Sequence, residues 1–366
     1  MKRAWLAALG LVAGWNPSAR AQPAVAPEQG APGFEVKVQR LDALFRAAAE
    51  GGGSYIVDYR AGGRGFTRSY GSLDCAGRVP MSPNALFDGG SLTKVFTSAA
   101  VFKLVEEGRL KLDDRLGELF GAVPGDKAGI TVAQLLAHRS GIPNFIGPDG
   151  ARLPESGWTV ESYDYSAASR AEMLKRAWAP PLRFPPGTQE EYSNYGYNLL
   201  AAVIERASGR SYEDYVRERI LAPAGMTSTG YRLPGAAGRK IADQCRDGKS
   251  WGNPIGRGVW ARGVSWNLMG AGGMMTSVAD LQRWNRAAAS GALFRPDIYR
   301  RFRATYFGPA YRSCGTDATF VGGSNGMTRS LIIHLPLRDE AVVAVGTSRE
   351  HPLPAEAELR DSICKP

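Results

Sequence analysis

Ser91 and Lys94 are the first residues of this chain with a potential for acyl-transfer chemistry. They stand three positions apart in a stretch, residues 87–105, whose apolar residues recur at near-helical spacing. That pattern predicts a buried helix with both residues on one face of its first turn. A lysine in an apolar interior is costly unless it is paired or loses its proton. A neutral amine there could remove the proton of a serine hydroxyl, and the helix N-terminus would favour the developing negative charge.

Tyr192 and Asn194 form a second candidate pair, just before a predicted helix at residues 196–208. A tyrosine phenol close to an ammonium loses its proton readily and can relay protons to and from a serine. An asparagine amide can hold a substrate carbonyl or the lysine. Ordinary structure also accounts for each pattern alone, because Ser-x-x-Lys recurs at residues 362–365 and Tyr192 fits a plain loop.

Gly323 and Ser324 lie in a glycine-rich segment, residues 320–325, next to a predicted strand. Glycines let a substrate lie against the backbone, and the amides of this segment could complete an oxyanion hole with the Ser91 amide. A plain glycine-rich turn between two strands explains the segment equally well.

Residues 322–326 also fit the Gly-x-Ser-x-Gly pattern of a nucleophile elbow, with Asp339 and His351 following in the matching order. An elbow requires a helix after the serine, whereas residues 328–335 are typical of a strand. We therefore disfavour this interpretation.

The predicted elements give an α+β fold. Strand patterns occur near both ends of the chain and helices dominate the middle, so we expect one antiparallel sheet built from both ends, flanked by helices, with a mainly helical subdomain beside it. A cleft between the two parts is the expected place for a site. The expected boundaries are a single domain over residues 34–350, a sheet part at about 34–90 and 300–350, a helical part at about 110–290, and a C-terminal tail or helix at 351–366.

The N-terminus indicates export. Residues 1–21 have a charged start, a short apolar run and a small-x-small cleavage pattern, which predict a secretory signal peptide; an N-terminal membrane anchor is the alternative. Residues 22–33 are rich in Pro, Gly and Ala and predict a disordered leader. No later stretch is long enough to cross a membrane, so the expected location is periplasmic or secreted.

Composition narrows the class of function. The 366 residues carry a formal charge of +10, which becomes +7 without Lys2, Arg3 and Arg20 of the signal. The arginines are scattered, which favours a solvated basic surface over nucleic-acid binding. The three histidines form no cluster, so we expect no metal and no cofactor. An exported chain permits disulfides, and sequence leaves open the three possible pairings of Cys75, Cys245, Cys314 and Cys364.

The order Ser-x-x-Lys, Tyr-x-Asn, glycine-rich strand resembles the penicillin-recognising serine hydrolases, the broad group of class C β-lactamases, D-alanyl-D-alanine peptidases and related esterases. Further matching stretches extend the resemblance over about residues 34–350; they are residues 135–142, 186–188, 223–226 and 270–274. The resemblance implies a β-lactamase/transpeptidase-like fold and an exported hydrolase of a small-molecule ester, amide, peptide or β-lactam.

Roles for individual residues follow from the resemblance. Ser91 would be the acylated nucleophile, activated by Lys94 and Tyr192, and Tyr192 would serve as the base when water hydrolyses the acyl-enzyme. Asn194 would hold the substrate amide or acyl carbonyl. The amides of Ser91 and Ser324 would form the oxyanion hole, with Gly323 beside it. His138, in the matching segment 135–142, would have a structural role.

Val321 departs from the resemblance, because related proteins carry Lys-Thr-Gly or His-x-Gly where this chain has residues 321–323. Loss of that cation would remove a substrate contact of about 1.5–3 kcal/mol, the range for a charged hydrogen bond, and favours neutral esters or amides. β-Lactamase, peptidase and esterase activities all remain open. A non-catalytic binding or regulatory protein on the same fold is the alternative, and the oligomeric state is open as well.

Overall fold

The computed structural model describes residues 33–144, 169–233, 236, 238–246, 249–250, 255, 264–306, 311–314, 316–348 and 350–365. The predicted signal peptide and all but the last residue of the predicted leader lie outside them. None of the helices in these ranges is both long and apolar enough to span a membrane.

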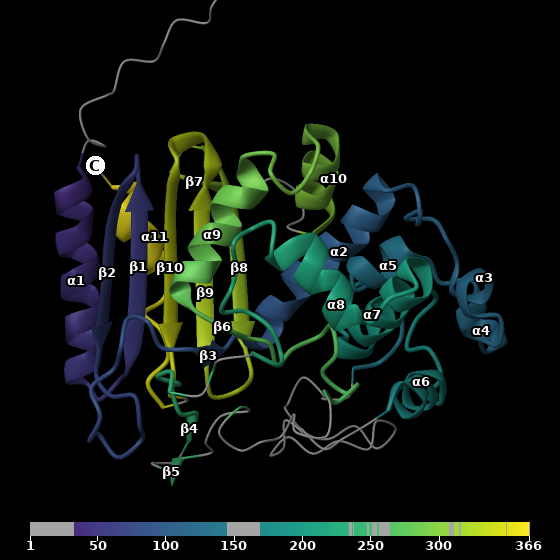
Figure 1. Ribbon diagram of the computed structural model, residues 1–366, viewed down its shortest axis with the longest axis horizontal. Helices are drawn as coiled ribbons and strands as arrows, with labels where there is room; N and C mark the ends of the chain where they lie inside the picture. Colours follow the sequence, from purple (N-terminus) through teal and green to yellow (C-terminus); the bar gives the residue numbers. More distant parts are fainter. Residues whose placement is uncertain are drawn as a thin grey trace, which may run out of the picture.

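A six-stranded antiparallel sheet forms one half of the molecule (Figure 1). Its strand order is β2-β1-β10-β9-β8-β7, so N-terminal strands pair with C-terminal ones, as the sequence predicts. The strands are β1 (Tyr55–Ala61), β2 (Arg64–Tyr70), β7 (Tyr311–Ser313), β8 (Thr316–Ser324), β9 (Arg329–Leu335) and β10 (Glu340–Gly346).

Both faces of the sheet are covered. Along β10, Val342 and Ala344 pack in the core beneath α1 (Phe34–Glu50) and α11 (Glu356–Cys364), whereas Val343 and Val345 belong to the core shared with the helical half. This alternation follows from the two-residue period of a strand. Helix α9 (Val278–Ala289) lies over the second face (Figure 1).

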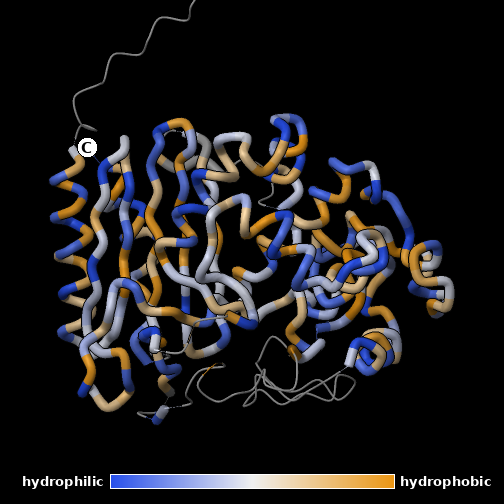
Figure 2. Tube along the Cα trace, viewed as in Figure 1, coloured by the Kyte–Doolittle hydropathy of each residue, from blue (hydrophilic) through white to orange (hydrophobic). Residues whose placement is uncertain are grey.

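The helical half surrounds α2 (Thr93–Glu106), which follows the 3-10 turn η1 (Gly90–Leu92). Eleven of its residues are buried, and it packs against α7, α8 and α10. By contrast, the trace of α1 alternates between hydrophilic and hydrophobic residues (Figure 2), because only one side of that helix is buried. The remaining helices are α3 (Leu116–Phe120), α4 (Gly125–Ala128), α5 (Val132–Leu136), α6 (Arg170–Trp178), α7 (Asn194–Ser208), α8 (Tyr212–Val216), η2 (Arg217–Leu221), α10 (Pro296–Tyr306) and η3 (Pro336–Arg338).

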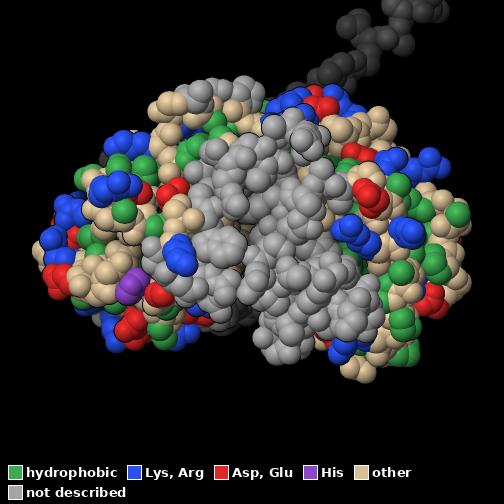
Figure 3. All heavy atoms as spheres, turned by 90° about the horizontal axis from the view of Figure 1, so that it is seen from below, with side chains coloured by type: hydrophobic (Ala, Val, Ile, Leu, Met, Phe, Trp, Pro, Cys, Tyr) green, Lys and Arg blue, Asp and Glu red, His purple; other side chains and the backbone are tan. Residues whose placement is uncertain are grey.

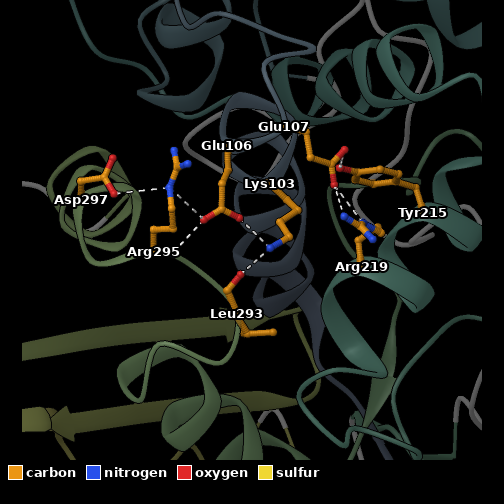
Figure 4. Close-up of polar contacts among 8 residues, drawn as sticks. All are labelled: Lys103, Glu106, Glu107, Tyr215, Arg219, Leu293, Arg295 and Asp297. Atoms are coloured by element: carbon orange, nitrogen blue, oxygen red, sulfur yellow. Dashed lines mark hydrogen bonds and ion pairs between the residues drawn. The ribbon is translucent and has the colours of Figure 1, made fainter. Parts of the chain in front are cut away.

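Ion pairs fix the end of α2 that lies away from Ser91 (Figure 4). Glu106 and Glu107 sit at its C-terminus, where the helix dipole disfavours negative charge. Lys103 lies 2.6 Å from the Glu106 carboxylate, and the backbone amide of Arg295 donates to the same group at 2.7 Å. Arg219 donates to Glu107 at 2.9 Å. These contacts tie α2 to η2 and to the segment before α10.

Two disulfides and one of the two short strand pairs join segments that are distant in the sequence. Strand β3 (Phe87–Asp88), just before η1, pairs with β6 (Met275–Thr276), and β4 (Cys245–Arg246) pairs with β5 (Lys249–Ser250). The cysteine pairing that the sequence left open is Cys75–Cys245 and Cys314–Cys364. The second disulfide anchors the end of α11 beside β8.

Surface charge agrees with the scattered pattern of the sequence. On the face shown in Figure 3, basic and acidic side chains of the described residues are interspersed around the rim.

A buried ion pair between α1 and the sheet gives a prediction about stability. Lys37 donates to Glu340 at 2.8 Å, and both side chains are less than 8% exposed. Because Glu340 keeps bonds from Tyr59 and Arg338, Lys37→Met should cost about 1.5–3 kcal/mol, the range for a charged hydrogen bond. Arg46→Met removes an exposed partner of Asp42 and should cost clearly less, because water screens an exposed ion pair. Urea unfolding compares the two, and equal losses would contradict this prediction.

Candidate active site

Ser91 lies in η1 and Lys94 in the first turn of α2, so the predicted spacing places both at the mouth of the buried helix. Ser91 is partly exposed, whereas Lys94 is 2% exposed. The local backbone is fixed by the hydroxyl of Thr93, which donates to the Gly90 carbonyl at 2.9 Å and accepts from the Met274 amide at 3.3 Å. The nucleophile candidate thus sits on a rigid turn.

The Lys94 amine is held by oxygens and has no ion-pair partner among the described residues. Its Nζ lies 2.7 Å from Asn194 Oδ1, 2.5 Å from the Ala271 carbonyl and 3.3 Å from Ser91 Oγ. Burial holds the pKa of this amine well below its usual value. A neutral amine has two N–H groups, and these donate hydrogen bonds to the two closer oxygens. Its lone pair then remains for the Ser91 hydroxyl proton.

Tyr192 completes the contacts of Ser91, with its hydroxyl 2.6 Å from Ser91 Oγ. The residue as a whole is 43% exposed, but its hydroxyl is enclosed by the protein, and this burial raises the pKa of the phenol to about 12. This shift is opposite to the sequence-based expectation of a tyrosine that loses its proton readily. The physical reason is that burial disfavours the phenolate. Burial also lowers the pKa of the neighbouring Lys94, so the ammonium that would favour a phenolate is itself disfavoured. Tyr192 therefore keeps its hydroxyl proton in this site.

His138 positions Tyr192. Its ring lies 4.6 Å from the Tyr192 ring and 5.0 Å from the Tyr197 ring, centroid to centroid. Its Nδ1 accepts from the Ser193 amide at 3.2 Å. Burial, together with the nearby Lys94, lowers the pKa of His138 to about 3. A neutral ring that stacks and accepts one hydrogen bond agrees with the structural role expected from sequence.

Asn194 begins α7, whose N-cap Ser193 accepts from the Gly196 amide. Its Oδ1 faces Lys94, while its backbone amide and Nδ2 both donate to Asn144 Oδ1, at 3.1 and 3.0 Å. Sequence analysis missed Asn144 and the Ala271 carbonyl. Both lie in or next to the matching stretches 135–142 and 270–274, which was the available signal.

Gly323 and Ser324 end β8 and face Ser91 across a cavity of about 550 Å³. The cavity extends over β8, where Gly322 has no side chain, to an apolar wall formed by Phe320, Leu331 and Leu353. Gly323 is required at its position, because a Cβ there would lie 2.4 Å from the Gly89 carbonyl oxygen. The structure thus brings the three predicted motifs to one cavity.

Val321 points into the core, 7% exposed, and supplies no cation to the cavity. Arg329 on β9 nevertheless lines the cavity, as does the acidic Glu356 at the start of α11. Arg329 pairs across the strands with Ser324, so both side chains lie on one face of the sheet. Arg329 is exposed, and its side chain has no recorded hydrogen bond or ion pair within the described residues. Sequence analysis missed it because its proximity depends on the β8–β9 register.

The nucleophile-elbow interpretation is wrong. After Ser324 the chain turns directly into strand β9 instead of a helix. Asp339 follows η3 at the opposite end of β9, so it cannot support a nucleophile at Ser324.

Comparison with known proteins identifies the family. The family model described as Beta-lactamase matches residues 41–363. The chain belongs to this family. Among curated relatives, penicillin-binding protein 4* of Bacillus subtilis is 32% identical over 45% of this chain and 34% of its own length. Protein flp of Staphylococcus aureus is 31% identical over 53% of this chain and 38% of its own length. The chain thus spans little more than a third of these relatives.

Solved structures support the same β-lactamase-family fold. The octameric penicillin-binding protein homologue from Pyrococcus abyssi aligns over 89% of this chain and 76% of its own, with a TM-score of 0.69 and 22% identity. SurE aligns over 90% of this chain and 75% of its own, with the same TM-score and 23% identity. The sequence-based fold prediction is confirmed.

The proton states of the site predict how Ser91 reactivity depends on pH. Labelling by a fluorophosphonate should speed up as pH rises through the lowered pKa of Lys94, because only the neutral amine accepts the serine proton. The rate should then stay level until Tyr192 ionises near pH 12. His138→Gln should show the same rise of the labelling rate with pH, since the pKa of His138 is about 3. A rise centred near the usual lysine pKa, or one that disappears in His138→Gln, would contradict the assignment of this rise to Lys94.

Proposed function

We propose that this protein is an exported serine hydrolase that forms an acyl-enzyme on Ser91 with a small-molecule ester or amide. The observation that supports this most strongly is the continuous line of contacts from Lys94 through Ser91 to Tyr192. A lysine with a purely structural role has no physical reason to be buried next to a serine hydroxyl without an ion-pair partner.

Acylation uses the neutral amine of Lys94 as general base. As Ser91 Oγ attacks the substrate carbonyl carbon, its proton passes to Lys94 Nζ, and the carbonyl oxygen becomes an oxyanion bound by the amides of Ser91 and Ser324. The tetrahedral intermediate then expels the leaving group. Tyr192 gives its hydroxyl proton to that group and regains a proton from the Lys94 ammonium. Because the raised pKa of Tyr192 disfavours a free phenolate, the two proton transfers must occur together.

Deacylation reverses these roles. Water attacks the acyl carbonyl, its proton passes to the Lys94–Tyr192 pair, and the released Ser91 oxygen takes a proton back. Because the pKa of Tyr192 is about 12, a free phenolate is costly at neutral pH, so we assign the proton-accepting role to the pair rather than to Tyr192 alone.

The cavity suggests the kind of substrate. Its apolar wall suits a hydrophobic group next to the reacting carbonyl, and Arg329 at the rim suits a carboxylate on that group. We therefore propose that carboxylate-bearing substrates are accepted despite Val321, through Arg329. The signal-like N-terminus and the two disulfides support export.

The function is tested by active-site labelling. The mature protein is incubated with a p-nitrophenyl ester, a fluorescent penicillin and a fluorophosphonate, and adducts are mapped by mass spectrometry. We expect an adduct on Ser91, ester turnover reduced at least about 1,000-fold in Ser91→Ala, and a comparable loss in Lys94→Met. Absence of any Ser91 adduct, with equal turnover in Ser91→Ala, would contradict hydrolysis and favour a non-catalytic binding protein.

The role of Arg329 is tested with a matched pair of esters, one carrying a free carboxylate and one its methyl ester. Arg329→Gln should lower kcat/KM for the carboxylate ester about 10- to 100-fold, the size of a charged hydrogen bond, and leave the neutral ester within about twofold. Arg300→Gln, which removes an exposed arginine from α10 outside the cavity, is the control. Equal effects of Arg329→Gln on both esters would contradict carboxylate recognition.

A further inference from the structure

We infer that Asp88 and Asn325 are positioning residues that hold together the two backbone segments supplying the oxyanion-binding amides. The inference rests on the function proposed above, in which the amides of Ser91 and Ser324 bind the oxyanion. The two segments come from opposite ends of the chain, and Asp88 and Asn325 are 237 residues apart. Their side chains meet directly, at 2.9 Å.

Asp88 anchors the segment on the Ser91 side. It belongs to β3 and is 2% exposed. One carboxylate oxygen accepts from the Gly90 amide at 2.8 Å, and the other accepts from Asn325 Nδ2 at 2.9 Å and from Gln244 Nε2 at 3.3 Å. Hydrogen bonds to a carboxylate are stronger than neutral ones. A single carboxylate therefore connects the amide of Gly90, the residue before Ser91, to the turn that follows β8.

Asn325 shapes the segment on the Ser324 side. It is 4% exposed, and its Oδ1 accepts from the amides of Met327 at 3.0 Å and Thr328 at 2.7 Å. Its backbone amide donates to the Thr328 carbonyl at 3.2 Å. The side chain thus closes the turn directly after Ser324 and directs its Nδ2 toward Asp88. The hydrogen bonds to Asp88, Met327 and Thr328 can form only with this orientation of the side-chain amide.

The two segments are so close that moving one moves the other. Gly90 has a positive φ of 52°, and a Cβ there would lie 2.6 Å from the carbonyl carbon and oxygen of Ser324. The Ser330 hydroxyl also donates to the Gly323 carbonyl at 3.3 Å. With no spare space between the segments, the Asp88–Asn325 bond controls where the Ser324 amide points relative to Ser91.

The role of this pair is geometric rather than electrostatic. Asp88 is negatively charged, so it would repel an oxyanion and cannot stabilise one directly. An oxyanion hole works because its donors are fixed before the charge develops, and loss of one donor costs about 100- to 1,000-fold in rate. A misdirected donor should cost part of that amount without weakening substrate binding.

A charge-swap cycle tests the pair. Asn325→Asp places two carboxylates against each other, whereas the double variant Asp88→Asn/Asn325→Asp restores one donor facing one acceptor and keeps acceptors for the turn amides. Stopped-flow acylation by a p-nitrophenyl ester separates the saturating rate from substrate affinity. We expect Asn325→Asp to lower the saturating rate about 10- to 100-fold with affinity within about threefold, and the double variant to recover most of the rate.

Gln244→Ala is the matched control, because it removes another donor to the same Asp88 oxygen without touching β8. It should keep acylation within about threefold of the wild type. Unchanged acylation in Asn325→Asp, a loss in Gln244→Ala as large as in Asn325→Asp, or a folded double variant as slow as Asn325→Asp would each overturn the inference. If Asn325→Asp does not fold, the rate of the double variant decides.

Failure of the proposed function would look different. A wild-type protein without any Ser91 adduct refutes acyl transfer, and the pair is then judged without turnover, by amide hydrogen exchange in peptides covering residues 324–328. Exchange should be faster in Asn325→Asp than in Gln244→Ala and should return toward the wild-type rate in the double variant. Equal exchange in all variants would overturn the inference on its own.

Discussion

The buried amine of Lys94 is the constraint on which the site depends. The surrounding protein removes almost all water from this amine and offers it no carboxylate among the described residues, so the neutral form is favoured. Its two N–H groups are accepted by Asn194 and the Ala271 carbonyl. The direction of the remaining lone pair, toward Ser91, follows from those two bonds. Burial of a lysine is costly for stability, and in the proposed function it supplies the base.

The two halves of the molecule meet around this amine. The helical half supplies Tyr192 and Asn194 from the start of α7, the sheet half supplies Ser324 at the end of β8, and α2 lies between them. Helix α2 follows η1, the turn that carries Ser91, and its far end is fixed by the ion pairs of Glu106 and Glu107 (Figure 4). Because Gly90 and Gly323 have no side chains, β8 can lie directly against η1, the turn that carries Ser91. Each half is incomplete as a site without the other.

Sequence predicted the parts whose signals are local. Alternating apolar and polar residues near both chain ends predicted the strands of the sheet, and the apolar stretch around Ser91 predicted α2. The three motifs, taken in order, gave the residues that the cavity brings together. Sequence missed what depends on distant neighbours. The proton state of Tyr192 follows from burial, Arg329 reaches the cavity through the β8–β9 register, and the Asp88–Asn325 bond joins residues with no local pattern. The chemical roles of the site residues stay predictions.

The most direct test is the protonation of Lys94 itself, measured by NMR on protein with isotope-labelled lysine side chains. The Lys94 signal, assigned by its absence in Lys94→Arg, is followed against pH in the free protein. The account predicts a titration midpoint well below the usual lysine value of about 10.4, with the amine neutral over the pH range in which Ser91 reacts. A midpoint at the usual value would contradict the account, because the amine would then be a charged structural group and not a base.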